Sequence, residues 1–299
     1  MNVLNSGKTR QVRKVQLGDH LCLPFSSDDE QREVLTTYIV DGLARGERVI
    51  YYADQTGPDV IGSWLADSGI EVNRVVDEGH LEIRSVDDGY LFGGRFEPDV
   101  VITTLWVEVR QARDAGYPGL RISGEMTSEL RPVADERSLL EFEHRLSRVF
   151  HSRELAAICQ YDQRLFNEAA VTGMISCHPQ VVQIDPLHDD RRLRIVPTYA
   201  PRGLRIVGTV DVMTVGALTT TLRLATRWPD QNIHLNLSEL EFIDVAGVRA
   251  IVRIAAGLEP GRSLIVEQLA LGLRKVFEVI GWDRTPGLRF AEGPEEVGS

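Results

Sequence analysis

Residues 20–53 read HLCLPFSSDDEQREVLTTYIVDGLARGERVIYYA and set the pattern for the N-terminal half of the chain. Two short apolar runs flank a longer amphipathic segment. Ser27 and Glu30 have the Ser-x-x-Glu spacing of a capping box, which predicts a helix that begins at Ser27 and ends near residues 42–46. The order of strand, helix and strand predicts an α/β fold with a largely parallel sheet covered by helices.

The same alternation continues outward to about residue 185. Further strands are predicted at residues 80–86, 119–126, 155–162 and 181–184. A helix between Asp135 and His151 is predicted to place four apolar residues on one face, namely Leu139, Phe142, Leu146 and Val149.

A polar, proline-containing stretch, residues 185–192, is the best candidate for a linker. Beyond it the pattern restarts, with strands predicted at 193–200, 203–212, 232–238 and 263–269 and helices at 215–228, from Val245, and at 270–282. The predicted organisation is a basic N-terminal tail (1–14), a first domain (15–184), the linker (185–192), a second α/β domain (193–291) and an acidic tail (292–299).

Composition narrows the class of protein. The chain has 299 residues, 43% of them hydrophobic, and a formal net charge of -11. Such an acidic balance argues against direct binding of nucleic acid or of an anionic membrane, and no apolar run approaches the ~20 residues that cross a bilayer. Cys22, Cys159 and Cys177 form no Cys-x-x-Cys pair, so we expect free thiols and a cytoplasmic protein.

Three segments of the C-terminal half carry a resemblance to a known family: GLRIVGTVDV (203–212), HLNLSELEFIDVAGVRAIVRIA (234–255) and LRKVFEVIGW (273–282). Over residues 190–290 the chain resembles the STAS domain of anti-sigma factor antagonists. The resemblance implies binding to an anti-sigma factor kinase or a related regulator. In that family the kinase phosphorylates a Ser or Thr at the helix entry after the Phe-Ile-Asp motif, and this switches off partner binding.

This chain departs from the STAS pattern at the phosphorylated position. Val245 stands there and has no hydroxyl, so we expect no phosphorylation at the helix entry. Thr214 and Ser238 are nearby hydroxyls that we interpret as turn or cap residues. Asp244 is expected to cap the helix that follows it. The predicted partner surface comprises Asp244, Val245, Arg249 and Arg253.

The N-terminal half resembles the MEDS sensory domain over residues 15–182. The residues that carry this resemblance lie in LGDHLCLPF (17–25), GERVIYYAD (46–54), RISGEM (121–126) and CQYD (159–162). The resemblance implies the sensing of a small molecule and a RecA- or KaiC-like core. A RecA-like NTPase needs a glycine-rich loop with a lysine, whereas this chain has no lysine between Lys14 and Lys275. We therefore expect no ATP hydrolysis, although Arg84 and Arg121 remain candidates for holding a phosphate.

The motif residues fall at or near the predicted carboxyl ends of strands, where ligands sit in doubly wound sheets. We expect a pocket that mixes apolar walls with a few polar anchors and accepts a small organic ligand. The candidate ligand-binding residues are His20, Cys22, Phe25, Tyr52, Glu125, Met126, Cys159, Tyr161, Asp162 and His178. Each of them, taken singly, is also compatible with an inert buried position.

Two other chemistries are open to the same residues. His20, Cys22, Cys159 and His178 are zinc-binding types, but one His-x-Cys pair with two distant partners is a weak signal, and we assign no metal and no cofactor. A Cys/His/Glu set permits acyl transfer in principle. Because no nucleophile motif surrounds Cys22 or Cys159, we do not expect an enzyme.

These observations predict a bacterial signalling regulator in which a ligand-sensing domain controls partner binding by a STAS domain. One alternative is a ligand-independent interaction or oligomerisation scaffold with a degenerate NTPase-like domain. Another is a sensor of nucleotide-type second messengers. The sequence leaves open the identity of the ligand and partner, and whether the chain forms a homodimer.

Overall fold

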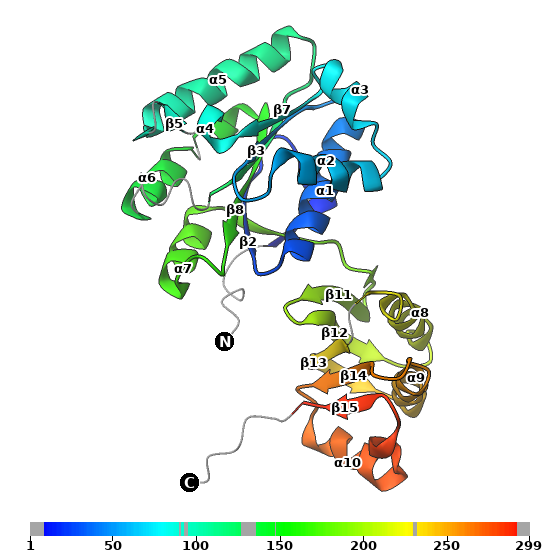
Figure 1. Cartoon of the computed structure of the whole chain (residues 1–299). Coiled ribbons are helices and arrows are strands. Elements are labelled where there is room, and N and C mark those ends of the chain that lie inside the picture. The colour runs from blue at the N-terminus through cyan, green and yellow to red at the C-terminus, as the bar shows by residue number, and fades with distance from the viewer. Residues whose placement is uncertain are drawn as a thin grey trace. The chain divides into compact units, whose positions relative to one another are not determined.

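The computed structural model describes residues 9–89, 91–92, 95–126, 136–146, 148–229 and 232–291. The chain divides into two compact units, residues 1–184 and 185–299 (Figure 1). Each unit is an α/β domain with its own sheet and core, as predicted.

The first unit is built on a parallel seven-stranded sheet of order β1-β9-β2-β8-β7-β3-β4. Its strands are β1 (Thr9–Gln11), β2 (His20–Phe25), β3 (Arg48–Ala53), β4 (Leu81–Ser85), β7 (Leu120–Glu125), β8 (Leu155–Asp162) and β9 (Gln180–Gln183). A small hairpin adds β5 (Leu91–Phe92) and β6 (Arg95–Phe96). Strands β2, β7 and β8 are buried along their whole length, which explains their nearly continuous apolar sequences.

Helices cover both faces of this sheet. One core contains residues of α5 (Pro98–Asp114), α6 (Glu136–Leu146) and α7 (Glu168–Cys177) together with Cys22, Ile122 and Cys159 of the sheet. The opposite core contains residues of α1 (Asp28–Ala44), α2 (Pro58–Asp67) and α3 (Val72–Asp77). The shorter helices of this unit are η2 (Val12–Lys14), α4 (Val86–Gly89) and η3 (Val149–Ser152).

The predicted start of α1 is correct, but the capping box is only half as expected. The Ser27 hydroxyl accepts a hydrogen bond from the Glu30 amide at 3.2 Å. The Glu30 carboxylate accepts a hydrogen bond from the amide of Ser26 at 3.0 Å, whereas a capping box would use the amide of Ser27, the next residue. Side-chain oxygens of Ser27 and Glu30 thus accept hydrogen bonds from two backbone amides at the start of the helix.

Two segments expected to be unstructured take part in the sheets. Residues 9–11 form β1, which pairs with β9, and Val12 is fully buried, so this part of the basic tail belongs to the first domain. Residues 188–189 of the expected linker form β10, which pairs with β11 of the second sheet. Lys8 and the acidic tail 292–299 lie outside the described residues.

The second unit has a mixed sheet of order β10-β11-β12-β13-β14-β15. Its strands are β10 (His188–Asp189), β11 (Leu193–Tyr199), β12 (Arg202–Val210), β13 (Asn232–Ile243), β14 (Ser263–Glu267) and β15 (Leu288–Phe290), and its helices are α8 (Val215–Ala225), α9 (Val245–Ala256), α10 (Leu271–Ile280) and η4 (Trp282–Arg284). The first three strands pair antiparallel and the last four pair in parallel. Strand β13 runs five residues beyond its predicted end, as far as Ile243.

The helices in the described part of the chain include none that is both long and apolar enough to span a membrane.

Candidate functional site

Strand alternation brings part of the predicted site together. In the parallel pair β2 and β8, Cys22 lies opposite Cys159, and both side chains belong to the core beneath α5, α6 and α7. His20 and Tyr161 lie two residues away on these strands and therefore share the same face. Tyr52 and Met126 belong to the same core.

Four buried side chains meet on this face and form what we call the His/Cys/Glu centre: His20, Glu143, Cys159 and His178. One Glu143 oxygen, Oε2, lies 3.2 Å from Nε2 of His20 and 3.3 Å from Nε2 of His178. Sγ of Cys159 lies 3.5 Å from Nε2 of His20 and 3.8 Å from Oε2 of Glu143. One nitrogen, oxygen or sulfur atom of each of the four residues thus faces the same small space, which we call the common point.

The surrounding contacts fix these side chains in place. Nδ1 of His178 lies 2.7 Å from the carbonyl oxygen of Met174, one turn earlier in α7, which leaves Nε2 directed at the centre. The other Glu143 oxygen, Oε1, accepts a hydrogen bond from the Tyr161 hydroxyl. The His20 ring stacks on Phe150 with ring centroids 4.5 Å apart and planes at 6°.

Charges inside the centre adjust to one another. Burial alone would raise the pKa of Glu143, but His178 and His20 outweigh it and the pKa lies far below its usual range. Burial lowers the pKa of His178, but the Glu143 carboxylate outweighs it, so the pKa of His178 is raised. The pKa of His20 is lowered, because burial and the neighbouring His178 both disfavour its charged form. These shifts favour charge on the pair of Glu143 and His178 and a neutral His20.

Burial also keeps the nearby thiols and the phenol protonated. It raises the pKa of Cys159, of Cys22 and of Tyr161 well above their usual values, and the Glu143 carboxylate adds to the effect in each case. The geometry differs from a nucleophile–base–acid relay. Cys159 and Glu143 approach the same nitrogen of His20, and the Nδ1 atom that an orienting acid would need has no hydrogen-bond partner among the described residues.

Glu143 is the residue of this centre that the sequence reasoning missed. It lies on the predicted helix face, four residues after Leu139 and three before Leu146, and it is fully buried. Phe142, Leu146 and Val149 are buried as expected, while the side chain of Leu139 lies outside the described residues. A carboxylate within the apolar stripe of an amphipathic helix was the available signal.

Glu125 lies on the face of the sheet opposite Cys22 and Cys159, so it does not join the His/Cys/Glu centre. Its Oε2 atom accepts hydrogen bonds from the amides of Gln55 at 2.8 Å, Thr56 at 3.0 Å and Asp54 at 3.3 Å. Its Oε1 atom accepts one from the Tyr51 hydroxyl at 2.8 Å. Glu125 therefore anchors the loop between β3 and α2, on the other side of the sheet from His20 and Cys22.

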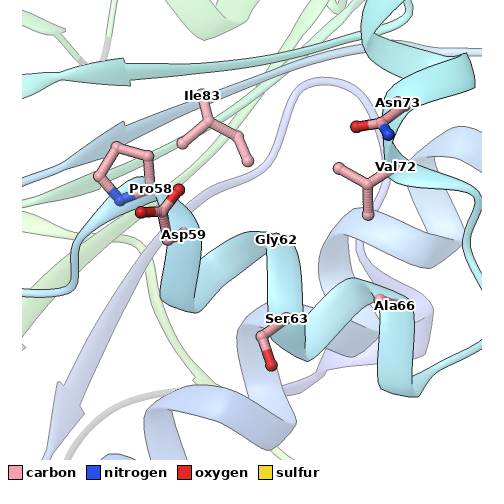
Figure 2. Close-up of a pocket in the computed structure, with 8 residues that line it drawn as sticks. All are labelled: Pro58, Asp59, Gly62, Ser63, Ala66, Val72, Asn73 and Ile83. Carbon is pink, nitrogen blue, oxygen red and sulfur yellow. The ribbon is translucent and has the colours of Figure 1, made fainter.

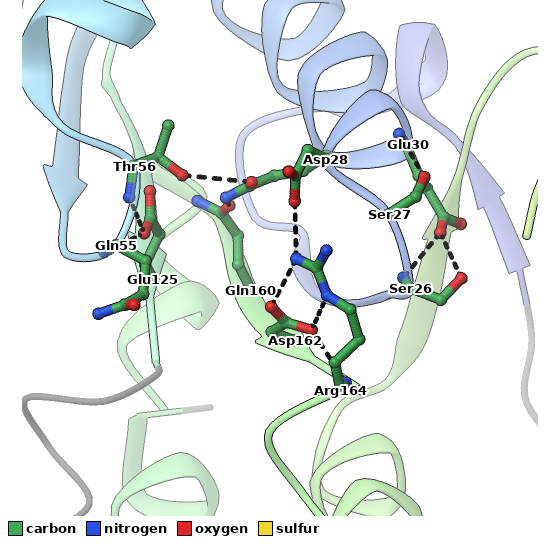
Figure 3. Close-up of polar contacts among 11 residues, drawn as sticks. Ser26, Ser27, Asp28, Glu30, Gln55, Thr56, Glu125, Gln160, Asp162 and Arg164 are labelled. Carbon is green, nitrogen blue, oxygen red and sulfur yellow. Dashed lines mark hydrogen bonds and ion pairs between the residues drawn. The ribbon is translucent and has the colours of Figure 1, made fainter. Parts of the chain in front are cut away.

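Phe25 and Asp162 form a third location at the ends of β2 and β8. Arg164 donates to both oxygens of Asp162 and to Asp28 of α1 (Figure 3). Its guanidinium carbon lies 5.9 Å from the centroid of the Phe25 ring. These carboxylates and the capped start of α1 occupy the region where an NTPase would bind phosphate.

The two arginines considered for phosphate binding are committed to carboxylates. Arg121 is fully buried and pairs with Glu47 at 2.6 Å. Arg84 pairs with Glu108 at 2.6 Å and also with Glu82. Neither guanidinium is available for a phosphate in this arrangement.

A surface hollow of about 500 Å³ lies between α2, α3 and β4 (Figure 2). It is lined by Pro58, Asp59, Gly62, Ser63, Ala66, Val72, Asn73 and Ile83. The lining includes none of the predicted ligand-binding residues, and Asp59 is its one charged side chain.

In the second unit, the predicted partner residues gather at the start of α9. Asp244 caps the helix, and its carboxylate accepts a hydrogen bond from the Gly247 amide at 2.8 Å. Val245 is 56% exposed. Arg249 and Arg253 are exposed one and two turns further along the helix, as the spacing predicts.

Family comparisons agree with both resemblances. The model of the MEDS family, described as the methanogen/methylotroph, DcmR sensory domain, matches residues 19–179. A model described as Mlab, STAS domain, matches residues 198–289. The sensory and STAS domains together define a signalling sensor or regulator, and STAS domains imply regulatory protein partners. The chain belongs to the MEDS family.

Two solved structures show a similarity at low sequence identity. No curated protein gives a significant match. The crystal structure of an anti-sigma factor antagonist from Mycobacterium paratuberculosis is similar at 18% identity and a TM-score of 0.29, covering 32% of this chain and 83% of that chain. The crystal structure of a KaiC-like protein from Pyrococcus horikoshii OT3 is similar at 14% identity and a TM-score of 0.42, covering 60% and 77%.

Proposed function

We propose that this protein is a cytoplasmic regulator whose MEDS domain receives a small-molecule signal and whose STAS domain binds an anti-sigma factor kinase or a related regulator. The sensory domain controls partner binding, and phosphorylation at the helix entry does not regulate it. The protein performs no catalytic step of its own. The observation that carries this proposal is Val245 at the entry of α9 in a chain that joins the two domains.

An exposed apolar surface surrounds Val245. Phe242 is 54% exposed at the end of β13, and Val212 and Met213, which follow β12, are 78% and 76% exposed. The ends of β12 and β13 are adjacent, because Thr209 pairs with Phe242. We call Val212, Met213, Phe242 and Val245 the helix-entry surface. Solvent-exposed apolar side chains of this size, grouped together, are typical of a protein-binding site.

Other hydroxyls near this surface are poor substitutes for a phosphorylated residue. Thr214 is 2% exposed, accepts a hydrogen bond from the Asp211 amide and donates one to the carbonyl of Thr209. A kinase cannot reach it without local unfolding. Ser238 is exposed within strand β13, where its amide donates a hydrogen bond to Oδ1 of Asn236 at 2.9 Å. These contacts support the interpretation of Thr214 as a turn residue, whereas Ser238 is a strand residue and not the turn or cap residue that we expected.

The sharpest test restores the missing hydroxyl. The full-length protein and its Val245→Thr variant are titrated against anti-sigma factor kinases of the same organism, with and without ATP. We expect the wild type to bind equally well in both conditions and the variant to lose binding once ATP is added. Val245→Ala is the matched control and should stay insensitive to ATP. Loss of wild-type binding together with phosphate on Ser238 would contradict the proposal.

A second measurement concerns the signal. Full-length protein is purified gently, denatured, and searched for released small molecules by mass spectrometry. A single compound present at a level comparable to the protein, whose addition changes partner affinity, supports a sensor. Partner binding that no compound in a cell extract alters would favour a ligand-independent scaffold.

A further inference from the structure

The His/Cys/Glu centre has the geometry of a metal site. A tetrahedral Zn²⁺ with bonds of ~2.0–2.2 Å to N and O and ~2.3 Å to S requires ligand–ligand separations of ~3.3–3.5 Å, and ~3.5–3.7 Å where sulfur is involved. The separations of Oε2 of Glu143 from the two imidazole nitrogens are 3.2 and 3.3 Å. Those from Sγ of Cys159 to His20 and Glu143 are 3.5 and 3.8 Å. All four atoms lie within 4.8 Å of one another, so the widest of the remaining pairs would have to close by up to about 1 Å around a bound ion.

Hydrogen bonds inside the centre do not account for all of its buried polar atoms. Nε2 of His178 lies 3.3 Å from Glu143, yet it makes no hydrogen bond of acceptable geometry with any described residue. The His178 side chain is fully buried and its Nε2 atom is directed at the common point. A metal ion would replace the proton on this nitrogen and use its lone pair, in place of an ion pair with poor hydrogen-bond geometry.

The surroundings orient the ligands as metal sites require. Metal-binding histidines usually donate their other ring nitrogen to a carbonyl or carboxylate, and His178 places Nδ1 at 2.7 Å from the Met174 carbonyl. Ligating carboxylates are themselves hydrogen-bonded, and Tyr161 donates to the second oxygen of Glu143. Both contacts engage the ring nitrogen of His178 and the Glu143 oxygen that lie away from the other ligand atoms.

Charge and chemistry select the ion. One thiolate and one carboxylate neutralise a divalent cation, so a loaded centre would bury no net charge. Mixed imidazole, thiolate and carboxylate ligands suit Zn²⁺, which takes four protein ligands in closed structural sites. The four side chains come from β2, α6, β8 and the residue after α7, so they connect two helices to the centre of the sheet.

We propose that His20, Glu143, Cys159 and His178 bind one Zn²⁺ in a closed tetrahedral site that fastens α6 and α7 to the sheet. The site has no open coordination position and its role is structural. This inference stands apart from the control of partner binding proposed above.

The first test measures metal in the full-length protein, expressed without an affinity tag that binds metals. We expect close to one zinc per chain by elemental analysis. After removal of zinc, added Co²⁺ should produce the charge-transfer band of a thiolate ligand in the wild type. These measurements need no variant, so they decide the question even where a variant does not fold.

Variants then assign the ligands. Cys159→Ser should abolish the cobalt–thiolate band, and Glu143→Gln and His178→Gln should lower the zinc content. Cys22→Ala is the matched control, because Cys22 pairs with Cys159 across the two strands but lies outside the four-atom cluster. It should keep both zinc and the band.

Three results would overturn the proposal. Folded wild-type protein that contains no zinc and takes up neither Zn²⁺ nor Co²⁺ would exclude the site. A cobalt–thiolate band that survives Cys159→Ser but disappears in Cys22→Ala would show that Cys22, and not Cys159, is the thiolate ligand. Stoichiometric iron or nickel in place of zinc would show the wrong ion.

Discussion

Sγ of Cys159 lies 3.5 Å from Nε2 of His20, although 139 positions separate the two residues in the sequence. The contact depends on the strand order, which places β2 directly beside β8 in the middle of the sheet. His20 pairs with Ala157, so Cys159 is its diagonal neighbour on the same face. The His/Cys/Glu centre therefore spans the two central strands, where a change in its protonation or loading acts on the core of the first domain.

As the pH rises above 6.5, the ordinary pKa of histidine, we expect the free energy of unfolding to fall in zinc-free protein and to rise in zinc-loaded protein. In zinc-free protein Glu143 raises the pKa of His178 against the effect of burial. A raised pKa contributes stability that is complete below the unfolded value and is lost as the pH rises through the folded value. His20 has a lowered pKa and is neutral in the folded chain, so it adds only a small rise in stability just above pH 6.5, where the unfolded imidazole loses its remaining protons.

Zinc reverses the sign, because its ligands must release their protons and zinc binding therefore strengthens with pH. The free energy of unfolding is measured in urea between pH 6.5 and the ordinary thiol pKa of 9.0, with and without a chelator. In zinc-free protein, His178→Gln should remove the decline that this histidine causes. Zinc-free stability that stays level across the range in the wild type would contradict the assigned ion pair.

Sequence patterns predicted the elements well where burial was continuous. Strand β8 was predicted at residues 155–162 and α9 from Val245, and both are observed there. The short edge strands β1 and β15 were missed, since three residues that include an arginine carry too little pattern.

The site was predicted less well, for a geometric reason. Strand ends at one edge of a sheet do converge, but neighbouring residues on a strand point to opposite faces. Glu125 and Met126 were therefore separated by the sheet, whereas His20, Cys159 and His178 came together. Glu143 depended on the packing of α6, which no local pattern in the sequence could position against β2.

We predict that Glu125 is a structural anchor. Glu125→Ala should leave three amides of the loop between β3 and α2 without their acceptor, at a cost of ~1–3 kcal/mol per group that stays buried. Glu125→Gln keeps one oxygen acceptor and should cost less. Urea unfolding compares the two variants, and hydrogen exchange at residues 54–56 locates the effect. Equal stability of Glu125→Ala and wild type would show that the loop does not depend on this carboxylate.

Gly42 in α1 is expected to tolerate no side chain. A Cβ atom there would lie 2.7 Å from Cδ of Arg121, which is fully buried and bound by Glu47, and 3.2 Å from Cγ2 of Val49. Overpacking of this kind costs ~1–3 kcal/mol, which outweighs the gain in helix propensity of ~1 kcal/mol.

The matched control for Gly42→Ala is Gly62→Ala in α2, where a Cβ atom meets nothing within 4 Å. Gly62→Ala should raise the thermal midpoint and Gly42→Ala should lower it. A rise in both would mean that the Arg121 side chain yields without loss.

Asp244 allows the cap of α9 to be separated from partner binding. Its carboxylate accepts the Gly247 amide at 2.8 Å, and Asp244→Ala should destabilise the helix by ~1 kcal/mol. Asp244→Asn retains an oxygen acceptor of the same reach and should keep most of that stability. Hydrogen exchange of the amides in residues 245–256, followed by mass spectrometry, measures the change locally. We expect faster exchange in the alanine variant, near-normal exchange in the asparagine variant, and partner binding that follows the same order. If Asp244→Asn instead abolished binding while exchange stayed normal, the carboxylate would contact the partner directly, and its role as a cap would be secondary.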